Sequence, residues 1–115
     1  MSTAFQSNQR QAGEVTILDL EGKLLHTGAD ELRNQVNQLL AANRRKFILN
    51  LEKLTAIDST GFGCLAACHT TITQKGGALR LLNPTGHVRI ALGWTRLSNF
   101  LETHTDEQQA LASLS

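Results

Sequence analysis

The run KFILNL, residues 46–51, narrows the possible folds of this chain more than any other segment. It is almost entirely apolar instead of alternating, which is typical of a strand covered on both faces, as in a parallel sheet. Two further strand-like runs, EVTILDL (14–20) and ALRLL (78–82), precede and follow it. Segments with helical spacing separate the three runs. Strands that alternate with helices predict a mainly parallel sheet with right-handed crossovers.

The first two helices have recognisable start signals. Apolar side chains recur at helical spacing over residues 28–42, behind Thr27, which forms an acidic variant of the capping box with Asp30. A second helix is expected to begin at Ser59, directly after the strand that contains KFILNL.

Signals for the later elements are shorter. Asn83-Pro84 predicts a helix start, with a cap residue followed by a proline in the first turn. NFLET (99–103) is consistent with a last short strand, and Thr105 with Gln108 predicts a capping box for a final helix. The expected fold class is therefore α/β, with a mixed, mainly parallel sheet and about four helices.

The length of 115 residues suits a single domain over residues 1–115. Residues 1–12 are mostly small and polar, and we expect either an edge strand around Phe5 or a frayed tail. The N-terminus lacks the apolar segment of a secretory signal, and no stretch approaches the roughly 20 apolar residues of a membrane span. Cys64 and Cys68 lie on one helical face, where reduced thiols are favoured over a disulfide. These features predict a cytoplasmic protein.

Composition also restricts the partners. The formal net charge is +1 and aromatic residues make up 4% of the chain. Bulk electrostatics therefore indicate neither nucleic acid nor an anionic membrane, and a base-stacking surface is disfavoured.

The segment IDSTGFG, residues 57–63, stands at the junction between a predicted strand and a predicted helix. Asp58 is the natural N-cap, which places the hydroxyls of Ser59 and Thr60 in a first turn where the helix dipole favours negative charge. The two glycines keep this turn small enough for another surface to approach. A phosphate on Ser59 would add about −1.5 to −2 charges and would change such a surface without unfolding the helix. The same residues also fit plain helix capping with packing glycines.

Catalytic interpretations of this segment meet specific obstacles. Thr60 separates the Asp-Ser pair from the glycine, unlike an aspartic-protease signature, and Ile57 occupies the position where a serine-hydrolase elbow needs glycine. The G-x-G of residues 61–63 lacks the third glycine of a dinucleotide fingerprint. For Cys64, Cys68 and His69, a metal site is disfavoured because the histidine is adjacent to Cys68 and no fourth ligand is apparent. We predict no metal, no cofactor and no catalytic residues.

Other conspicuous residues have ordinary explanations. His26, His87 and His104 are expected to face solvent or to be satisfied locally. Arg44-Arg45-Lys46 suits a helix C-terminus, with an acidic-partner patch as the alternative. Trp94 is predicted to be buried or half-buried, with an exposed partner anchor as the alternative.

The sequence resembles the STAS family, the domain shared by sulfate transporters and anti-sigma factor antagonists. The segments that carry the resemblance are VTILDLEGKL (15–24), FILNLEKLTAIDSTGFGCL (47–65), KGGALRLLNPTGHVRIAL (75–92) and LETHTDEQQAL (101–111). They cover nearly the whole chain in order. The D-S-[ST]-G-x-G core is fairly specific when an apolar strand precedes it and a helix follows.

The resemblance implies a small STAS-like domain with helices mostly on one side of the sheet. In the stand-alone antagonists, the first serine after the aspartate accepts phosphate from an anti-sigma factor that is also a kinase, and that position is Ser59 here. The unphosphorylated antagonist binds the anti-sigma factor and frees the sigma factor, and a phosphatase resets the switch. Such a protein is a bacterial transcription regulator and a kinase substrate, not an enzyme. For this chain, a homodimer is a separate expectation. The predicted partner-binding residues are Asp58, Ser59, Thr60, Gly61, Phe62, Gly63, His26 and Thr27.

The chain departs from the family pattern at two places. Lys23 and Leu25 make the segment GKLLHTGAD (22–30) less acidic than is usual, and Phe62 replaces the more usual leucine. The alternative function is a STAS subunit of a larger assembly, stressosome-like or part of a lipid-transport complex, in which Ser59 is mainly structural. An enzyme would need a base or a metal near Ser59.

Overall fold

The computed structural model of the chain describes residues 5–99 and 101–115. Within these residues lies a five-stranded sheet in the order β1-β2-β3-β4-β5. Its strands are β1 (Phe5–Ala12), β2 (Val15–Leu24), β3 (Lys46–Ile57), β4 (Ala78–Leu82) and β5 (Thr103–His104). β1 pairs antiparallel with β2, and the other neighbours pair in parallel. The predicted mixed, mainly parallel sheet is confirmed.

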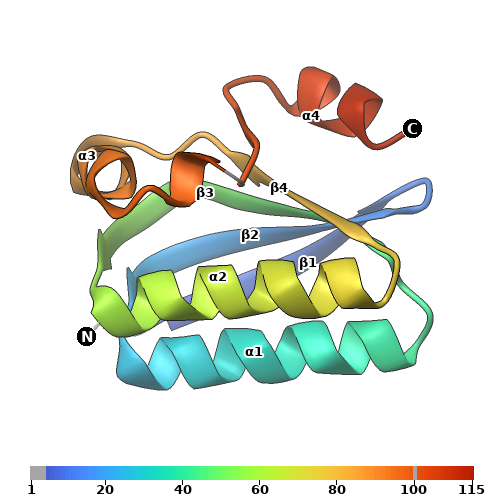
Figure 1. Cartoon of the computed structure of the whole chain (residues 1–115), viewed down its shortest axis with the longest axis horizontal. Helices are drawn as coiled ribbons and strands as arrows, with labels where there is room; N and C mark the ends of the chain where they lie inside the picture. The colour runs from blue at the N-terminus through green and yellow to red at the C-terminus, as the bar shows by residue number, and fades with distance from the viewer. Residues whose placement is uncertain (1–4, 100) are drawn as a thin grey trace.

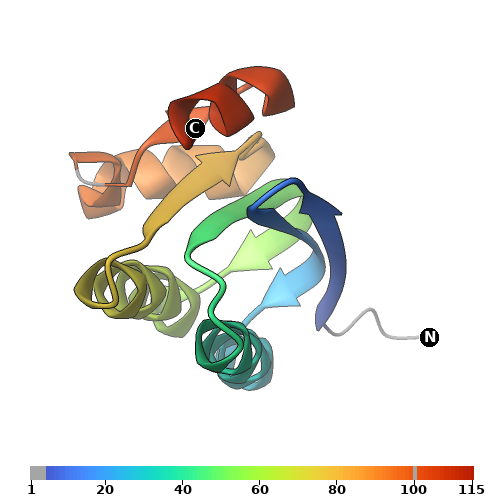
Figure 2. The same cartoon turned by 90° about the vertical axis from the view of Figure 1, so that its right-hand side faces the viewer.

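The helices are α1 (His26–Ala41), α2 (Ser59–Gln74), α3 (Gly86–Thr95) and α4 (Glu107–Ser113), with a short 3₁₀ turn at Leu97–Asn99. α1 and α2 lie side by side on one face of the sheet, and α4 lies on the other (Figures 1 and 2). α3 sits at the end of the sheet where α1 and α2 begin (Figure 1). The expected number of helices and their predominance on one side are both found.

The N-terminal segment is an edge strand. β1 pairs with β2 along its whole length, from Phe5 opposite Gly22 to Ala12 opposite Val15. Gly13 makes the tight turn between them with a φ of +62°, a conformation that favours glycine. Residues 1–4 of the predicted tail lie outside the described residues.

Two layers of buried side chains surround β3, as the run KFILNL predicts. Phe47, Leu49 and Leu51 are completely buried on the side of α1 and α2. Ile48 points to the opposite side, into a smaller cluster with Ala110 of α4. Burial on both faces explains why this strand lacks polar alternation.

β2 and β3 are longer than their apolar runs. Their pairing continues to Leu24 opposite Ile57, with two register shifts on the way. α1 accordingly starts at His26 with Leu25 as its N-cap, and the cap makes no side-chain hydrogen bond. The predicted start at residue 28 and the Thr27–Asp30 capping box are wrong. β2 ends at Leu24 and α1 begins only two residues later, so Thr27 already lies inside the helix.

Two later helix starts also differ from the prediction. The Asn83 N–H donates to the His104 carbonyl at 2.9 Å, so Asn83 extends the pairing of β4 with β5 instead of capping a helix. Thr85 is the N-cap of α3. For α4 the N-cap is Asp106, whose carboxylate accepts from the Gln108 N–H at 2.9 Å, and not Thr105.

Candidate functional site

The ends of β2 and β3 place two helix starts side by side. Because Leu24 pairs with Ile57, the helices that follow these strands, α1 and α2, begin at the same edge of the sheet (Figure 1). The two predicted site segments, residues 26–27 and 58–63, are therefore neighbours in space although about thirty residues separate them in the chain. This carboxyl edge of a sheet is where α/β folds usually hold their ligands.

Asp58 caps α2 as predicted. Its backbone is extended, with φ −115° and ψ −173°, and its carboxylate accepts from the Gly61 N–H at 2.9 Å. The Asp58 carbonyl accepts the first regular helical bond, from the Phe62 N–H at 3.0 Å. This cap satisfies one of the otherwise unpaired donors of the first turn and stabilises the start of α2.

Ser59 and Thr60 follow the cap in the first helical turn. Ser59 is exposed, whereas Thr60 is half-buried. Within the described part of the chain, the Ser59 hydroxyl makes no hydrogen bond. Ser59 therefore presents its oxygen to solvent at the positive end of the helix dipole.

The two glycines of the segment have different roles. Gly61 is buried, and a Cβ atom there would collide with the Leu24 carbonyl and lie 2.6 Å from Cγ1 of Ile57. The absence of a side chain at Gly61 thus allows α2 to pack closely against β2 and β3. It does not leave room for an approaching partner, contrary to the expectation from the sequence. Gly63 is exposed, and a Cβ atom there would meet nothing within 4 Å. This glycine therefore leaves no side chain projecting from the outer surface of α2. Phe62 is half-buried and packs against the main core.

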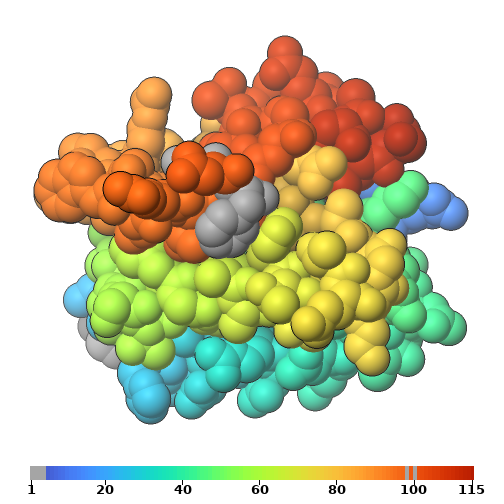
Figure 3. All heavy atoms as spheres, viewed as in Figure 1, coloured from blue at the N-terminus to red at the C-terminus, as the bar shows by residue number. Residues whose placement is uncertain are grey.

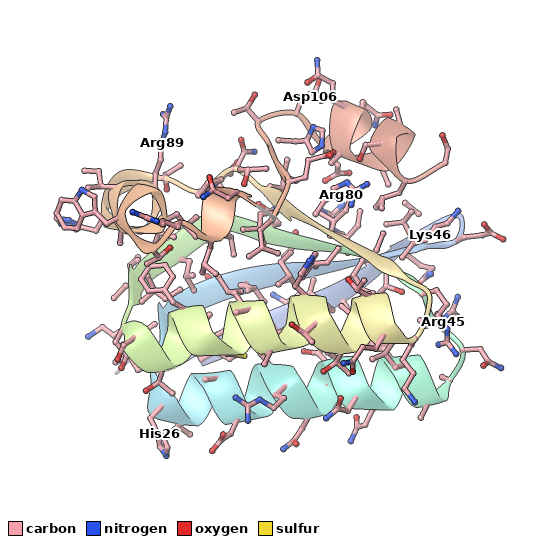
Figure 4. The ribbon with its side chains drawn as sticks, viewed as in Figure 1. His26, Arg45, Lys46, Arg80, Arg89 and Asp106 are labelled. Carbon is pink, nitrogen blue, oxygen red and sulfur yellow. The ribbon has the colours of Figure 1, made fainter. Side chains whose placement is uncertain are left out.

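His26 and Thr27 begin α1 and are both exposed. Figure 4 shows His26 at the end of α1 with its ring directed away from the protein. Gly28 behind them is buried, where a Cβ atom would lie 2.6 Å from Cβ of Phe5. His26 and Thr27 therefore lie on the surface at the N-terminus of α1, and this end of the helix packs against β1 at Gly28.

The two cysteines are buried and reduced. Their sulfur atoms are 4.0 Å apart on consecutive turns of α2, and the Cys64 thiol lies 3.3 Å from the Ala29 carbonyl that accepts its hydrogen bond. The hydrogen bond with Cys64, together with burial, raises the pKa of the Cys68 thiol well above its ordinary value. No group of three or more His, Cys, Asp or Glu side chains that could hold a metal occurs in residues 5–99 and 101–115.

The other side chains singled out from the sequence serve local structure. Arg45 Nη1 donates to the Leu40 carbonyl at 2.9 Å, so it satisfies the C-terminal end of α1. His87 is exposed, and the half-buried His104 ring lies 2.6 Å from the Glu102 carboxylate. That hydrogen bond is the main reason why the pKa of Glu102 lies below its ordinary value.

A polar cluster that sequence reasoning missed lies on the α4 face of the sheet. Arg10 Nη2 donates to Asp19 of β2 at 2.9 Å and to Glu107 of α4 at 2.8 Å. Asn50 Nδ2 also donates to Asp19, at 2.8 Å. The hydrogen bond from Arg10 lowers the pKa of Asp19 below its ordinary value of 3.8. Glu107 is 97 residues from Arg10 in the chain, so no local signal could reveal this cluster.

Trp94 is the clearest departure from the sequence prediction. It is 82% exposed, and Ile90, one turn earlier in α3, is 55% exposed. Val88 and Leu92 occupy the buried side of the same helix. The sequence of this helix contains two apolar pairs at i, i+4 spacing, offset by two residues. The pairs therefore lie on opposite sides of the helix, so only one of them can face the core, and this pattern could have predicted an exposed pair.

The STAS domain family model matches residues 6–110. The chain belongs to the STAS domain family. Among curated relatives, the STAS chain is 30% identical over 103 residues to an anti-sigma F factor antagonist of Paenibacillus polymyxa, covering 87% of this chain and 86% of that protein. The family resemblance noted from the sequence is thereby confirmed.

Solved structures with the same STAS fold include two further antagonists. An anti-sigma factor antagonist from Mycobacterium paratuberculosis has a TM-score of 0.87 at 16% identity, covering 99% of this chain and 98% of that one. The Bacillus cell fate determinant SpoIIAA in its phosphorylated form has a TM-score of 0.72 at 23% identity, covering 96% and 99%. At these identities the likeness establishes the fold. None of the helices in the described residues of this STAS chain is long and apolar enough to cross a membrane.

Proposed function

We propose that this chain is a phosphorylation-switched anti-sigma factor antagonist. With Ser59 unphosphorylated it binds and sequesters an anti-sigma factor kinase, and so frees a sigma factor. The observation that carries the proposal is the exposed Ser59 hydroxyl at the N-terminus of a capped helix. Its support comes from membership of the STAS family and from the 30% identity to an anti-sigma F factor antagonist.

The chemical step makes this protein a substrate and not an enzyme. The partner kinase transfers the γ-phosphoryl group of ATP to Ser59 Oγ: the new O–P bond forms, the bond to ADP breaks, and the hydroxyl proton passes to a base of the kinase. A phosphatase returns the hydroxyl by hydrolysis. ATP and magnesium belong to the kinase, so no cofactor is needed by this chain.

Phosphorylation changes the surface more than the fold. Phosphoserine carries about −1.5 to −2 charges, and an exposed helix N-terminus favours a negative charge by about 0.3–1 kcal/mol. The neighbouring carboxylate of Asp58 opposes this gain. Because Ser59 contacts solvent and not the core, the new volume and charge act on whatever docks over residues 26–27 and 58–63. We place this switch in the bacterial cytoplasm, where its kinase and sigma factor would act.

The test is binding to a candidate anti-sigma factor kinase, with phosphosite mapping after incubation with ATP. Wild type and Ser59→Ala should bind with similar affinity, whereas phosphorylated protein and Ser59→Asp should bind much more weakly. Thr60→Ala asks whether the neighbouring hydroxyl accepts phosphate instead. Thr73→Asp is the matched control, because it places the same charge on an exposed residue near the other end of α2.

Equal binding by all variants, with no phosphate on Ser59, would contradict the proposal. Ser59 would then be a helix-start residue only. That result would favour a STAS subunit of a larger assembly, in which partner binding is indifferent to the residue at position 59.

A further inference from the structure

One side of α3 carries an apolar ridge, which we define as Ile90 and Trp94. The two side chains are 55% and 82% exposed and lie one turn apart. Val88 and Leu92, on the opposite side of the helix, are buried in the main core. The ridge therefore contributes little to the packing of this chain, although exposing a tryptophan to water is unfavourable.

The chain segment that carries the ridge is basic. Residues 83–101 contain Arg89, Arg96 and His87 but no aspartate or glutamate. All three side chains are exposed, and Figure 4 shows Arg89 extending from α3 into solvent. An apolar anchor flanked by arginines is a composition typical of the energetically dominant part of a protein interface.

The ridge belongs to the same end of the molecule as Ser59. α3 contacts β3, whose carboxyl end runs directly into Asp58 and α2. On the face shown in Figure 3, α3 lies directly above the first turns of α2. A partner that covers the start of α2 can therefore reach α3 without crossing another element.

We propose that the α3 ridge anchors the anti-sigma factor, with Trp94 and Ile90 inserted in an apolar pocket whose rim is acidic. The inference rests on the proposed function and specifies the partner's surface. Arg89 and Arg96 attract the acidic rim, whereas a phosphate on Ser59 repels it. One electrostatic arrangement thus accounts for both binding and release.

Two other occupants fit less well. In a symmetric pair of copies joined ridge to ridge, the arginines beside one ridge would face those beside the other, and like charges across an interface are unfavourable. An anionic membrane would suit the charges, but two apolar side chains on a ten-residue helix offer little area for insertion.

Trp94 allows a direct test, because it is the single tryptophan of the chain. We would titrate the intact protein with a candidate anti-sigma factor kinase whose own tryptophans are replaced by phenylalanine. Complex formation should shift Trp94 emission to the blue and reduce its quenching by acrylamide several-fold. Trp94→Ala should weaken binding about tenfold or more, and Trp94→Phe should retain part of the affinity.

The arginines are tested with a matched pair. Arg89→Ala should weaken binding and reduce its salt dependence, whereas Arg44→Ala should change neither. Arg44 is exposed and follows the C-terminus of α1, which lies at the opposite end of the molecule from α3 (Figure 1). Thermal unfolding of each variant should match wild type, since none of these side chains is buried.

The outcomes separate this inference from the proposed function. If Ser59→Asp abolishes binding but Trp94 stays quenchable and Trp94→Ala binds normally, the ridge inference is overturned while the switch stands. If no kinase binds or modifies the protein, both are overturned. A blue shift produced by anionic phosphatidylglycerol vesicles but not by the kinase would assign the ridge to a membrane. Concentration-dependent self-association abolished by Trp94→Ala would assign it to a second copy.

Discussion

The Leu24 carbonyl occupies the space that a side chain at Gly61 would need. This contact joins the end of β2 to the first turn of α2, and Ile57 encloses the same point from β3. It fixes how closely Ser59 stands to the start of α1. The candidate site thus owes its geometry to a backbone contact between elements far apart in the chain.

Gly61→Ala should destabilise the protein, by about 1–3 kcal/mol for an overpacked site. Gly63→Ala is the matched control. Its Cβ would meet nothing within 4 Å, so replacing a helical glycine should stabilise by about 0.5–1 kcal/mol. Urea denaturation monitored by circular dichroism measures both. Equal effects of the two substitutions would contradict the assigned packing role of Gly61.

Removing the cap of α2 should cost stability. Asp58→Ala loses the bond to the Gly61 N–H and should lower the free energy of unfolding by about 0.5–2 kcal/mol, whereas Asp58→Asn should retain most of it. Asp30→Ala provides the comparison, because Asp30 is exposed and makes no cap bond in α1. A loss of stability at Asp30 as large as that at Asp58 would argue against the observed start of α1.

A negative charge at position 59 should leave the fold intact. We expect Ser59→Asp to change the free energy of unfolding by no more than about +1 kcal/mol, in the stabilising direction, because the helix N-terminus favours an anion. Thr73→Asp, near the C-terminus of α2, should be destabilising by a similar amount. Chemical denaturation at low ionic strength measures the pair, and strong destabilisation by Ser59→Asp would mean that phosphorylation acts by unfolding α2.

The Arg10–Asp19 pair should make stability depend on acid pH. The folded pKa of Asp19 lies below its ordinary value of 3.8, so the unfolded chain takes up the proton first. The stabilisation is therefore complete at neutral pH and is lost as pH falls from about 5 through the folded pKa. Asp19→Asn should reduce stability by about 0.5–1 kcal/mol at pH 7 and flatten this part of the profile.

A matched control is available for that profile. The Glu14 side chain is 86% exposed and pairs with Lys46 at 3.3 Å, so Glu14→Gln should leave both stability and its pH dependence nearly unchanged. Thermal unfolding from pH 2 to pH 7 supplies the comparison. An unaltered acid profile in Asp19→Asn would show that Asp19 has no such linkage.

The cysteines should react slowly in the folded protein. Burial and the raised pKa of Cys68 keep its thiolate scarce, so reaction with a thiol-specific disulfide reagent at pH 8 should be roughly a hundredfold slower than in urea. Single Cys64→Ala and Cys68→Ala variants separate the two thiols. Rapid native labelling of Cys68 would contradict its buried position.

Local signals predicted the elements well where short-range chemistry decides them. Asp58 caps α2 because a carboxylate at this position can accept a hydrogen bond from an unpaired N–H group two or three residues later, and no distant contact is needed. The Thr27–Asp30 and Asn83-Pro84 signals failed for a different reason. β2 ends at Leu24 and α1 begins at His26, so Thr27 lies inside the helix and cannot be its cap. The Asn83 N–H is used in strand pairing, because it donates to the His104 carbonyl.

The sequence indicated which residues could form the candidate site, but not how these residues are arranged in space. Ser59 and its neighbours follow from the junction of strand and helix together with the family pattern. Their position beside His26 depends on the pairing of Leu24 with Ile57. The burial of Gly61 and the exposure of Trp94 depend on which surfaces meet, and no spacing within one helix specifies that.

The sequence by itself determined the order of strands and helices, the parallel character of the sheet and the capped start of α2, because hydrophobic period and capping act within a few residues. The tertiary structure alone decided how far β2 and β3 extend, which apolar side of α3 faces the core and how Arg10 joins the sheet to α4. Those outcomes depend on contacts between residues distant in the chain, and such contacts exist only once the sheet has assembled.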